Sequence, residues 1–194
     1  MISLENVRIE YDGKPLFDDV SFMVRQKEKI GLVGNNGSGK STLLKLIHGD
    51  IKPTEGNVNI SSEMKIGYLP QHMIHREDQT VYLSVFNSLG EISRLHADIQ
   101  ELNREVAERE DYHSDEYSRI LDDLKVKTEK YHLLGGDKVE SAIERTLTGL
   151  GFNREDLNQP LSVFSGGWKM RVELAKILLN EPDVLLLDEP TNHL

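Results

Sequence analysis

A glycine-rich octapeptide near the N-terminus has the residue types and spacing of a phosphate-binding loop. Its residues are Gly34, Asn35, Asn36, Gly37, Ser38, Gly39, Lys40 and Ser41. Two glycines bracket four residues, and Lys and Ser follow, which is the pattern of a P-loop. Backbone N–H groups of such a loop surround phosphate oxygens. We expect Lys40 to reach the β- and γ-phosphates and the hydroxyl of Ser41 to hold Mg²⁺. Thr42 is a further candidate for binding the nucleotide. The alternative is a glycine-rich surface turn.

Two adjacent carboxylates near the C-terminus are candidates for the hydrolytic chemistry. Asp188 and Glu189 follow the apolar run 184–187, which is typical of a buried strand. At such a position Asp188 would support Mg²⁺, directly or through water, and Glu189 would polarise the attacking water. An acidic strand cap is the alternative, and the P-loop upstream in the same chain favours the functional interpretation.

Three further candidates carry weak signals when taken alone. Ser165-Gly166-Gly167 stands before a predicted helix over 169–179, where N–H groups and the helix dipole favour an anion. Gln71 follows a predicted strand and is by itself an ordinary polar loop residue. Tyr11, at the end of the first predicted strand, has a ring that can stack on a nucleotide base, although a half-exposed strand aromatic is the commoner explanation.

The surrounding elements are arranged to position these residues. The run 29–33 is short and apolar, as expected of a buried parallel strand before the P-loop, and a helix over 42–48 follows it and ends at Gly49. Loose alternation over 2–11 predicts a strand, closed by a turn at 12–15 and followed by a strand over 20–24. Short strands are expected at 57–60 and 65–68, and helices at 80–89 and 137–150.

Between these parts, the sequence predicts two heptad helices joined by a short polar break. The first apolar seam is Ile92, Leu95, Ile99, Leu102 and Val106, and the second is Tyr117, Leu121, Leu124, Thr128 and Tyr131. Helices of similar length with such seams indicate an antiparallel hairpin over about 91–134. It contains twelve acidic and seven basic residues. A projecting hairpin is favoured over a helical face packed on its own domain.

Composition restricts the function classes. The 194 residues are 38% hydrophobic and 29% charged, as in a soluble globular chain. The absence of cysteine excludes disulfides and thiolate metal sites. The net charge of −10 argues against a broad positively charged surface that would bind nucleic acid. No apolar run approaches the length of a transmembrane helix, and the first residues lack a signal-peptide pattern.

Taken together, the ordered motifs resemble the nucleotide-binding domain of the ATP-binding cassette superfamily. Tyr11, the P-loop, Gln71, Ser165–Gly167 and Asp188-Glu189 match its A-loop, Walker A, Q-loop, signature and Walker B motifs. The resemblance implies an α/β P-loop fold with an antiparallel β subdomain and a parallel core sheet, and ATP and Mg²⁺ as ligands. It also implies that Gln71 senses Mg²⁺ and the γ-phosphate, and that the signature binds the γ-phosphate of ATP held by a second cassette.

Two features resemble the F subfamily in particular. Glu189 precedes Pro190-Thr191-Asn192-His193-Leu194, and Phe164-Ser165-Gly166-Gly167-Trp168 carries Trp where transporter cassettes usually carry Gln. The hairpin stands where F-type proteins carry their arm. The resemblance implies a cytoplasmic ATPase with two cassettes in one chain, whose partner is the ribosome through its RNA and proteins. The expected parts are 1–79 with the P-loop and Gln71, 80–160 with the hairpin, and 161–194 with the signature and Walker B.

The sequence departs from the family pattern after Leu194, because the D-loop aspartate, the histidine switch, the linker and the second cassette are not in it. In the family fold, the strand after Walker B lies between the P-loop strand and the Walker B strand. We therefore expect an incomplete central sheet with open edges, self-association of this chain, and weak or no hydrolysis by it alone.

Other functions remain open from the sequence. The main alternative is the ATP-binding energy subunit of a membrane transporter, which Asn192–Leu194, Trp168 and the hairpin disfavour. A DNA-repair or chromosome-structure ATPase would normally carry a far longer coiled-coil insertion. A nucleotide-binding scaffold without turnover is disfavoured by the intact Lys40, Asp188 and Glu189.

Overall fold

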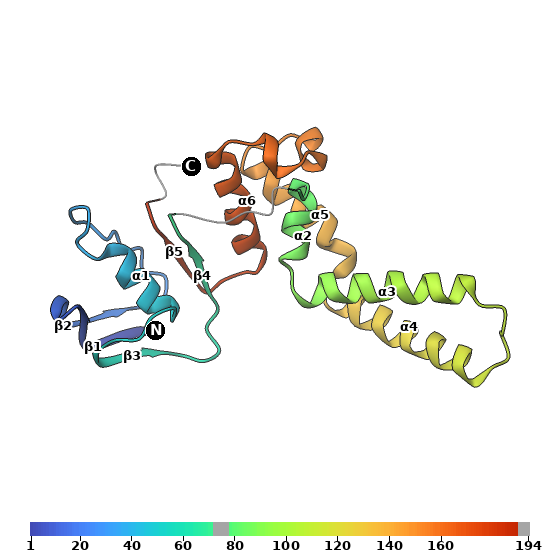
Figure 1. The fold of residues 1–194 in the computed structure, drawn as a ribbon, viewed down its shortest axis with the longest axis horizontal. Helices are drawn as coiled ribbons and strands as arrows, with labels where there is room; N and C mark the ends of the chain where they lie inside the picture. Colours follow the sequence, from blue (N-terminus) through green and yellow to red (C-terminus); the bar gives the residue numbers. More distant parts are fainter. Residues whose placement is uncertain (72–77, 190–194) are drawn as a thin grey trace. The chain divides into compact units, whose positions relative to one another are not determined.

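The computed structural model describes residues 1–71 and 78–189. They form two compact units, one of Met1–Met73 with Glu181–Leu194 and one of Ile74–Asn180. Figure 1 shows the elements of each unit. No helix in the described ranges is long and apolar enough to cross a membrane.

The first unit contains an antiparallel sheet in the order β2-β1-β3, formed by β1 (Ile2–Tyr11), β2 (Lys14–Val24) and β3 (Glu55–Ile60). Asp12 and Gly13 both have positive φ angles, of 50° and 74°. That is the two-residue hairpin turn whose twist matches the flanking strands. β2 therefore begins at Lys14, directly after the turn, and not at residue 20 as the apolar pattern predicted.

Helix α1 (Lys40–His48) lies between this sheet and a second, parallel pair of strands, β4 (Ile66–Leu69) and β5 (Val184–Leu187). Its apolar face is buried by the sheet on one side and by the strand pair on the other. The buried residues of this core are Ile2, Leu4, Val7, Ile9, Leu43, Leu46, Ile47 and Leu186. The core thus fixes the helix that follows the P-loop against β4 and β5, and the two carboxylates follow β5 directly.

The strand expected at 29–33 is absent, and this prediction was wrong. These residues have no regular strand structure, and Ile30, Leu32 and Val33 are 60%, 44% and 94% exposed. A strand needs a neighbour to pair its N–H and C=O groups, and no other part of the described chain forms a ladder with this segment. Over residues 1–71 and 78–189, the parallel sheet has two strands, β4 and β5, in agreement with the expected incomplete core sheet.

The second unit packs helices α2 (Val81–Asn87), α5 (Gly136–Gly149) and α6 (Gly166–Leu179) around one core, with two short 3₁₀ segments at Arg154–Asn158 and Leu161–Val163. The hydroxyl oxygen of Thr80 accepts a hydrogen bond from the Leu83 N–H and caps α2, as the sequence indicated. The fully buried centre of the core comprises Val81, Val85, Ile143, Leu147, Leu161, Val172 and Ala175.

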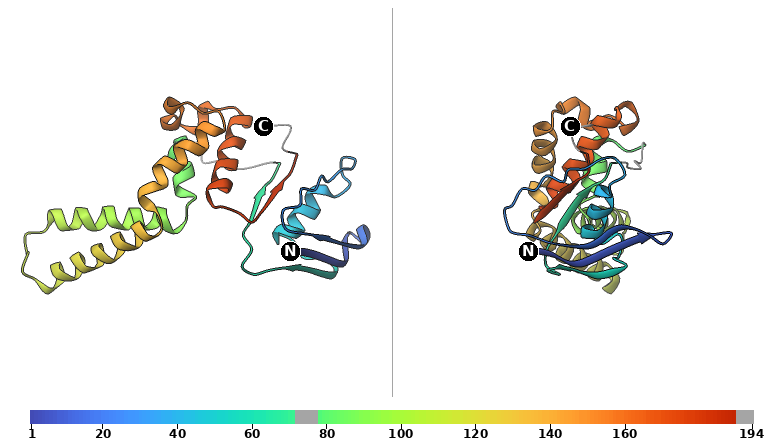
Figure 2. Two further views of the ribbon diagram at one scale, coloured as in Figure 1. Left: turned by 180° about the vertical axis from the view of Figure 1, so that it is seen from behind. Right: turned by 90° about the vertical axis from the view of Figure 1, so that its left-hand side faces the viewer.

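Helices α3 (Glu91–Glu108) and α4 (Asp115–Leu133) form the predicted antiparallel hairpin and extend away from the other helices of the second unit (Figure 2). Two ion pairs cross it, from Lys127 to Asp98 at 2.6 Å and from Lys130 to Glu91 at 2.5 Å. The seam on α4 differs from the prediction at one position. Leu121 is 41% exposed, and the neighbouring Ile120 is the partly buried residue.

Candidate functional site

The P-loop is a tight turn that leads directly into α1. The Ser38 N–H donates to the carbonyl of Asn35 at 3.1 Å, and α1 begins at Lys40. The Lys40 ammonium donates to the carbonyls of Gly34 and Asn35, at 2.9 and 3.0 Å. The first N–H groups of a helix have no intrahelical acceptor, and the helix dipole is positive there. The loop therefore combines a cation and orphan N–H donors, as an anion site requires.

Gly39 is the residue that makes this start of the helix possible. It is the N-cap of α1 with φ of 94°, a conformation that L side chains rarely adopt. A Cβ atom at this position would lie 2.6 Å from the ring of Phe17 in β2 and 3.2 Å from Leu16. Phe17 of β2 therefore packs against the end of the P-loop at Gly39, a role that the sequence pattern did not indicate.

The parallel pairing of β4 with β5 brings two predicted site residues together. Leu69 pairs with Leu187, so Gln71 and Glu189 each lie two residues beyond the same rung of the ladder. The Gln71 Nε2 group donates to Glu189 Oε2 at 2.8 Å. Glu189 has φ of 49°, an unusual value for a residue other than glycine. Residues 118 positions apart thus form one polar pair.

Asp188, the other predicted carboxylate, is 4% exposed. Its backbone N–H donates to the carbonyl of Leu69 at 3.0 Å, and Tyr68 Oη donates a long hydrogen bond of 3.5 Å to Asp188 Oδ2. Burial, together with the nearby Asp188 charge, raises the pKa of Tyr68 to about 12. Tyr68 is therefore a neutral donor to this carboxylate throughout the physiological range. Tyr68 was not among the predicted site residues, and its place three residues before Gln71 was the available signal.

The oxygen donors expected for Mg²⁺ all belong to the first unit. Ser41 lies in the first turn of α1, and Gln71 and Asp188 follow β4 and β5. Hydroxyl, amide and carboxylate oxygens are hard ligands that suit this ion. Because the Gln71 amide donates its NH₂ group to Glu189, its oxygen remains available to accept a hydrogen bond or to bind a cation. Over the described ranges, no three His, Cys, Asp or Glu side chains form a metal site by themselves. The donor set therefore fits an ion that is shared with phosphate oxygens.

Tyr11 ends β1 opposite Lys14, at the tip of the antiparallel ribbon, and is 55% exposed. Its ring makes no aromatic contact with any described residue. The role of Tyr11 in stacking on a base stays a prediction.

The signature residues lie in the second unit. Ser165 is the N-cap residue of α6, and Gly166 and Gly167 form the first turn of this helix. The helix therefore begins three residues earlier than the sequence predicted, and the Ser-Gly-Gly segment supplies the orphan N–H groups of its N-terminus. The predicted role of this segment in binding phosphate is untested. The segment from Pro190 to Leu194 lies outside the described residues.

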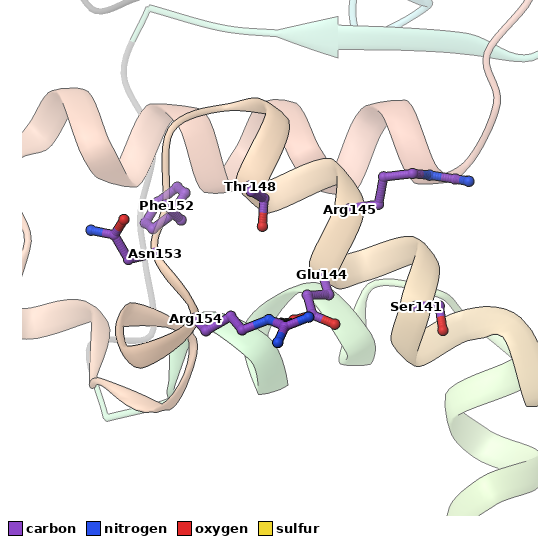
Figure 3. Close-up of a pocket in the computed structure, with 7 residues that line it drawn as sticks. All are labelled: Ser141, Glu144, Arg145, Thr148, Phe152, Asn153 and Arg154. Carbon is purple, nitrogen blue, oxygen red and sulfur yellow. Dashed lines mark ion pairs between the residues drawn. The ribbon is translucent and has the colours of Figure 1, made fainter.

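The cavity in Figure 3 is separate from every predicted site residue. It has a volume of about 420 Å³ and lies within the second unit, beside α5 and the loop that follows it. Its lining residues are Ser141, Glu144, Arg145, Thr148, Phe152, Asn153 and Arg154.

Comparison with known proteins decides the family. The model of the ABC transporter family matches residues 17–192, which include the P-loop, Gln71, the signature and both carboxylates. The chain belongs to the ABC transporter family. This ABC chain is 37% identical over 194 residues to ABC transporter F family member 5 of Arabidopsis thaliana and 38% identical over 194 residues to the probable ATP-binding protein YbiT of Escherichia coli O157:H7. It is 33% identical over 201 residues to the tylosin resistance ATP-binding protein TlrC of Streptomyces fradiae.

Each of these matches covers the whole of this chain but only 28%, 35% and 35% of the relative. The chain therefore spans about a third of the length of these curated relatives. Among solved structures, a putative ABC transporter ATP-binding protein of Pyrococcus furiosus superposes with a TM-score of 0.66 at 20% identity, over 97% of this chain and 75% of that one. A dimeric bacterial ABC transporter cassette gives 0.64 at 23%, over 100% and 76%. The ABC cassette fold expected from the motifs is confirmed.

Proposed function

We propose that this ABC chain is one cassette of an F-type ATPase, that it binds and hydrolyses ATP with Mg²⁺, and that it acts on the ribosome in the cytoplasm. The hydrogen bond between Gln71 and Glu189 carries the catalytic part of this proposal, because it holds a predicted γ-phosphate sensor against a predicted base. The F-type relatives support the subfamily.

Within the cassette, each residue has a separate task. Lys40 and the N–H groups at the start of α1 would bind the phosphates, which requires Lys40 to exchange the Gly34 and Asn35 carbonyls for phosphate oxygens. Mg²⁺ would be held by Ser41, Gln71 and Asp188 and would neutralise charge on the phosphates. Glu189 would accept a proton from the attacking water, and the Gln71 amide would fix the orientation of its carboxylate.

The γ-phosphate contact of this site would come from the signature of a second cassette, and Ser165–Gly167 would contribute the same contact to the other site. The N-terminus of α6, with two glycines in its first turn, supports that role because it offers N–H donors without side-chain obstruction. This chain alone would therefore bind ATP and hydrolyse it slowly or not at all.

The hairpin would be the part that meets the ribosome, although several of its basic residues are already engaged. Arg109 pairs with Asp111 and Glu116 at 2.8 and 2.7 Å, and Arg104 pairs with Glu101. The exposed basic residues Arg119 and Lys125 on α4 form no ion pair within the described part of the chain. Because phosphate contacts rest on such cations, we place the RNA contacts of the hairpin at Arg119 and Lys125.

The test is a trapping experiment with the protein expressed from its complete gene. Glu189→Gln removes the base while it keeps the side-chain volume, so ATP should persist and the protein should co-sediment with ribosomes when ATP is present. Glu63→Gln, in the exposed turn before β4, is the matched control. Co-sedimentation equal to that of the wild type would contradict the ribosome role, and co-purification with a membrane protein would favour the energy subunit of a transporter.

A further inference from the structure

One arginine connects the signature helix to the end of α5. The Cζ atom of Arg171 lies 4.6 Å from the centroid of the Trp168 ring, which is a cation–π contact within α6. Its Nη1 group donates to the carbonyl of Leu150 at 3.0 Å. Leu150 is the C-cap residue of α5, where carbonyl groups lack intrahelical donors. The guanidinium therefore satisfies a carbonyl at the end of α5 and packs on Trp168 near the start of α6.

Aromatic packing reinforces this connection on both sides of the signature. Phe164, directly before Ser165, lies 5.6 Å from Phe152, and Trp168 lies 4.8 Å from the same ring. Phe152 follows α5 after a short loop and is 2% exposed. Its ring meets both neighbours at steep angles, which is the favourable edge-to-face arrangement. The signature segment is thus held at both of its flanks by the loop that follows α5.

The opposite end of α5 is connected to the hairpin. Tyr131 of α4 donates from its hydroxyl to the carbonyl of Gly136, the first residue of α5, at 3.1 Å. A Cβ atom at position 136 would lie 2.3 Å from the Tyr131 ring, so this approach requires glycine. The ring of His96 in α3 lies 5.8 Å from the Tyr131 ring and 5.2 Å from Phe86 in α2. Helix α4 therefore contacts the start of α5 through Tyr131, and α3 contacts the same tyrosine through His96.

Between its two ends, α5 is a continuous helix of 14 residues, or roughly 21 Å. Its stripe of Val139, Ile143 and Leu147 is 8%, 0% and 0% exposed within the core of the second unit. An ion pair between Glu144 and Arg154 attaches the following loop to the same helix, as Figure 3 shows. A packed helix with side-chain contacts at each end moves as a unit, because close-packed interiors transmit displacement.

We propose that Tyr131 and Arg171 are positioning residues that make α5 a strut between the hairpin and the signature segment Ser165–Gly167. A displacement of the hairpin at Tyr131 moves the start of α5, and Arg171 passes that displacement to the first turn of α6. This inference rests on the proposed role of Ser165–Gly167 as the contact for a γ-phosphate held by a second cassette. The strut itself is a property of the second unit and exists without nucleotide.

The first experiment measures amide hydrogen exchange in peptides that cover 164–172, without nucleotide, in the protein expressed from its complete gene. Tyr131→Phe removes only the hydroxyl. The matched control is Tyr117→Phe near the tip of the same helix, since the Tyr117 hydroxyl has no hydrogen bond to the described residues. Loss of one neutral hydrogen bond should speed exchange over 164–172 about two- to fivefold in Tyr131→Phe and leave it unchanged in the control. Unchanged exchange over 164–172 in Tyr131→Phe would overturn the proposal.

The second experiment measures steady-state ATP hydrolysis in the same full-length protein. Arg171→Ala should lower kcat about tenfold or more, as expected for loss of a charge-assisted hydrogen bond, with KM for ATP changed less than about twofold. Arg171→Lys keeps the charge above Trp168 and should recover part of kcat. If the alanine variant does not fold, the lysine variant is compared with the wild type in its place.

The two experiments fail in different ways. A change of KM alone, or a wild-type kcat in a folded Arg171 variant, would contradict the strut. If the wild-type protein itself hydrolyses no ATP, the proposed function fails, and the exchange experiment still decides whether α5 couples the hairpin to the signature segment.

Discussion

Gly39→Ala tests the geometry of the P-loop with a change of one methyl group. Gly39 has φ of 94°, and an alanine there would lose about 1–2 kcal/mol to backbone strain. The new Cβ would also lie 2.6 Å from the Phe17 ring, which has to move, and overpacking of this kind costs about 1–3 kcal/mol. We therefore expect Gly39→Ala to lower the free energy of unfolding by about 2–5 kcal/mol, which equilibrium unfolding in urea will measure.

A double-mutant cycle with Phe17→Ala separates the two contributions. Removal of the ring leaves space for the methyl group but does not change φ at position 39. In the Phe17→Ala background, Gly39→Ala should therefore cost only about 1–2 kcal/mol, with a coupling of about 1–3 kcal/mol between the two sites. Additive effects, or a cost below about 0.5 kcal/mol for Gly39→Ala in the wild type, would refute the contact between β2 and the P-loop.

Three further predictions follow from particular contacts. Thr80→Ala removes the N-cap of α2 and should cost about 1 kcal/mol in urea unfolding, and an unchanged midpoint would contradict the cap. Burial raises the pKa of Tyr68 to about 12, so the contribution of the neutral Tyr68 to stability is present below pH 10 and lost as the pH rises from 10 to 12. Tyr68→Phe should remove this alkaline loss of stability. A Tyr68→Phe variant that loses stability between pH 10 and 12 as the wild type does would contradict the role of Tyr68. The exposed apolar segment 29–33 should make the 194-residue chain self-associate, and Val33→Lys should make it monomeric, as measured by light scattering. A monomeric wild-type chain would exclude this role of the segment.

Local patterns in the sequence were sufficient for the elements that depend on neighbours in the chain. The Thr80 cap, the stripe of α5 and the two helices of the hairpin follow from spacing over a few turns. The same patterns placed the P-loop before α1. The Asp12-Gly13 turn was recognised, but its two-residue form, which lets β2 begin at Lys14, depends on φ angles that the pattern does not contain.

Contacts between distant segments were beyond such patterns. The pairing of Gln71 with Glu189 depends on the register between β4 and β5, which no local feature of either strand specifies. The roles of Tyr68 and Phe17 depend on the same tertiary packing. The apolar run 29–33 has the composition of a buried strand, yet composition cannot supply the neighbouring strand that such a segment needs. The prediction therefore failed where the required partner lay outside the local sequence.

The most direct test of the central claim is to measure ATP binding and ATP hydrolysis together in Glu189→Gln, in the protein expressed from its complete gene. If Glu189 is the base that Gln71 orients, Mg²⁺–ATP should bind within about threefold of the wild type, while the rate of hydrolysis should fall about 100-fold or more. Hydrolysis at the wild-type rate with normal binding would contradict the assignment of Glu189 and the catalytic account built on it.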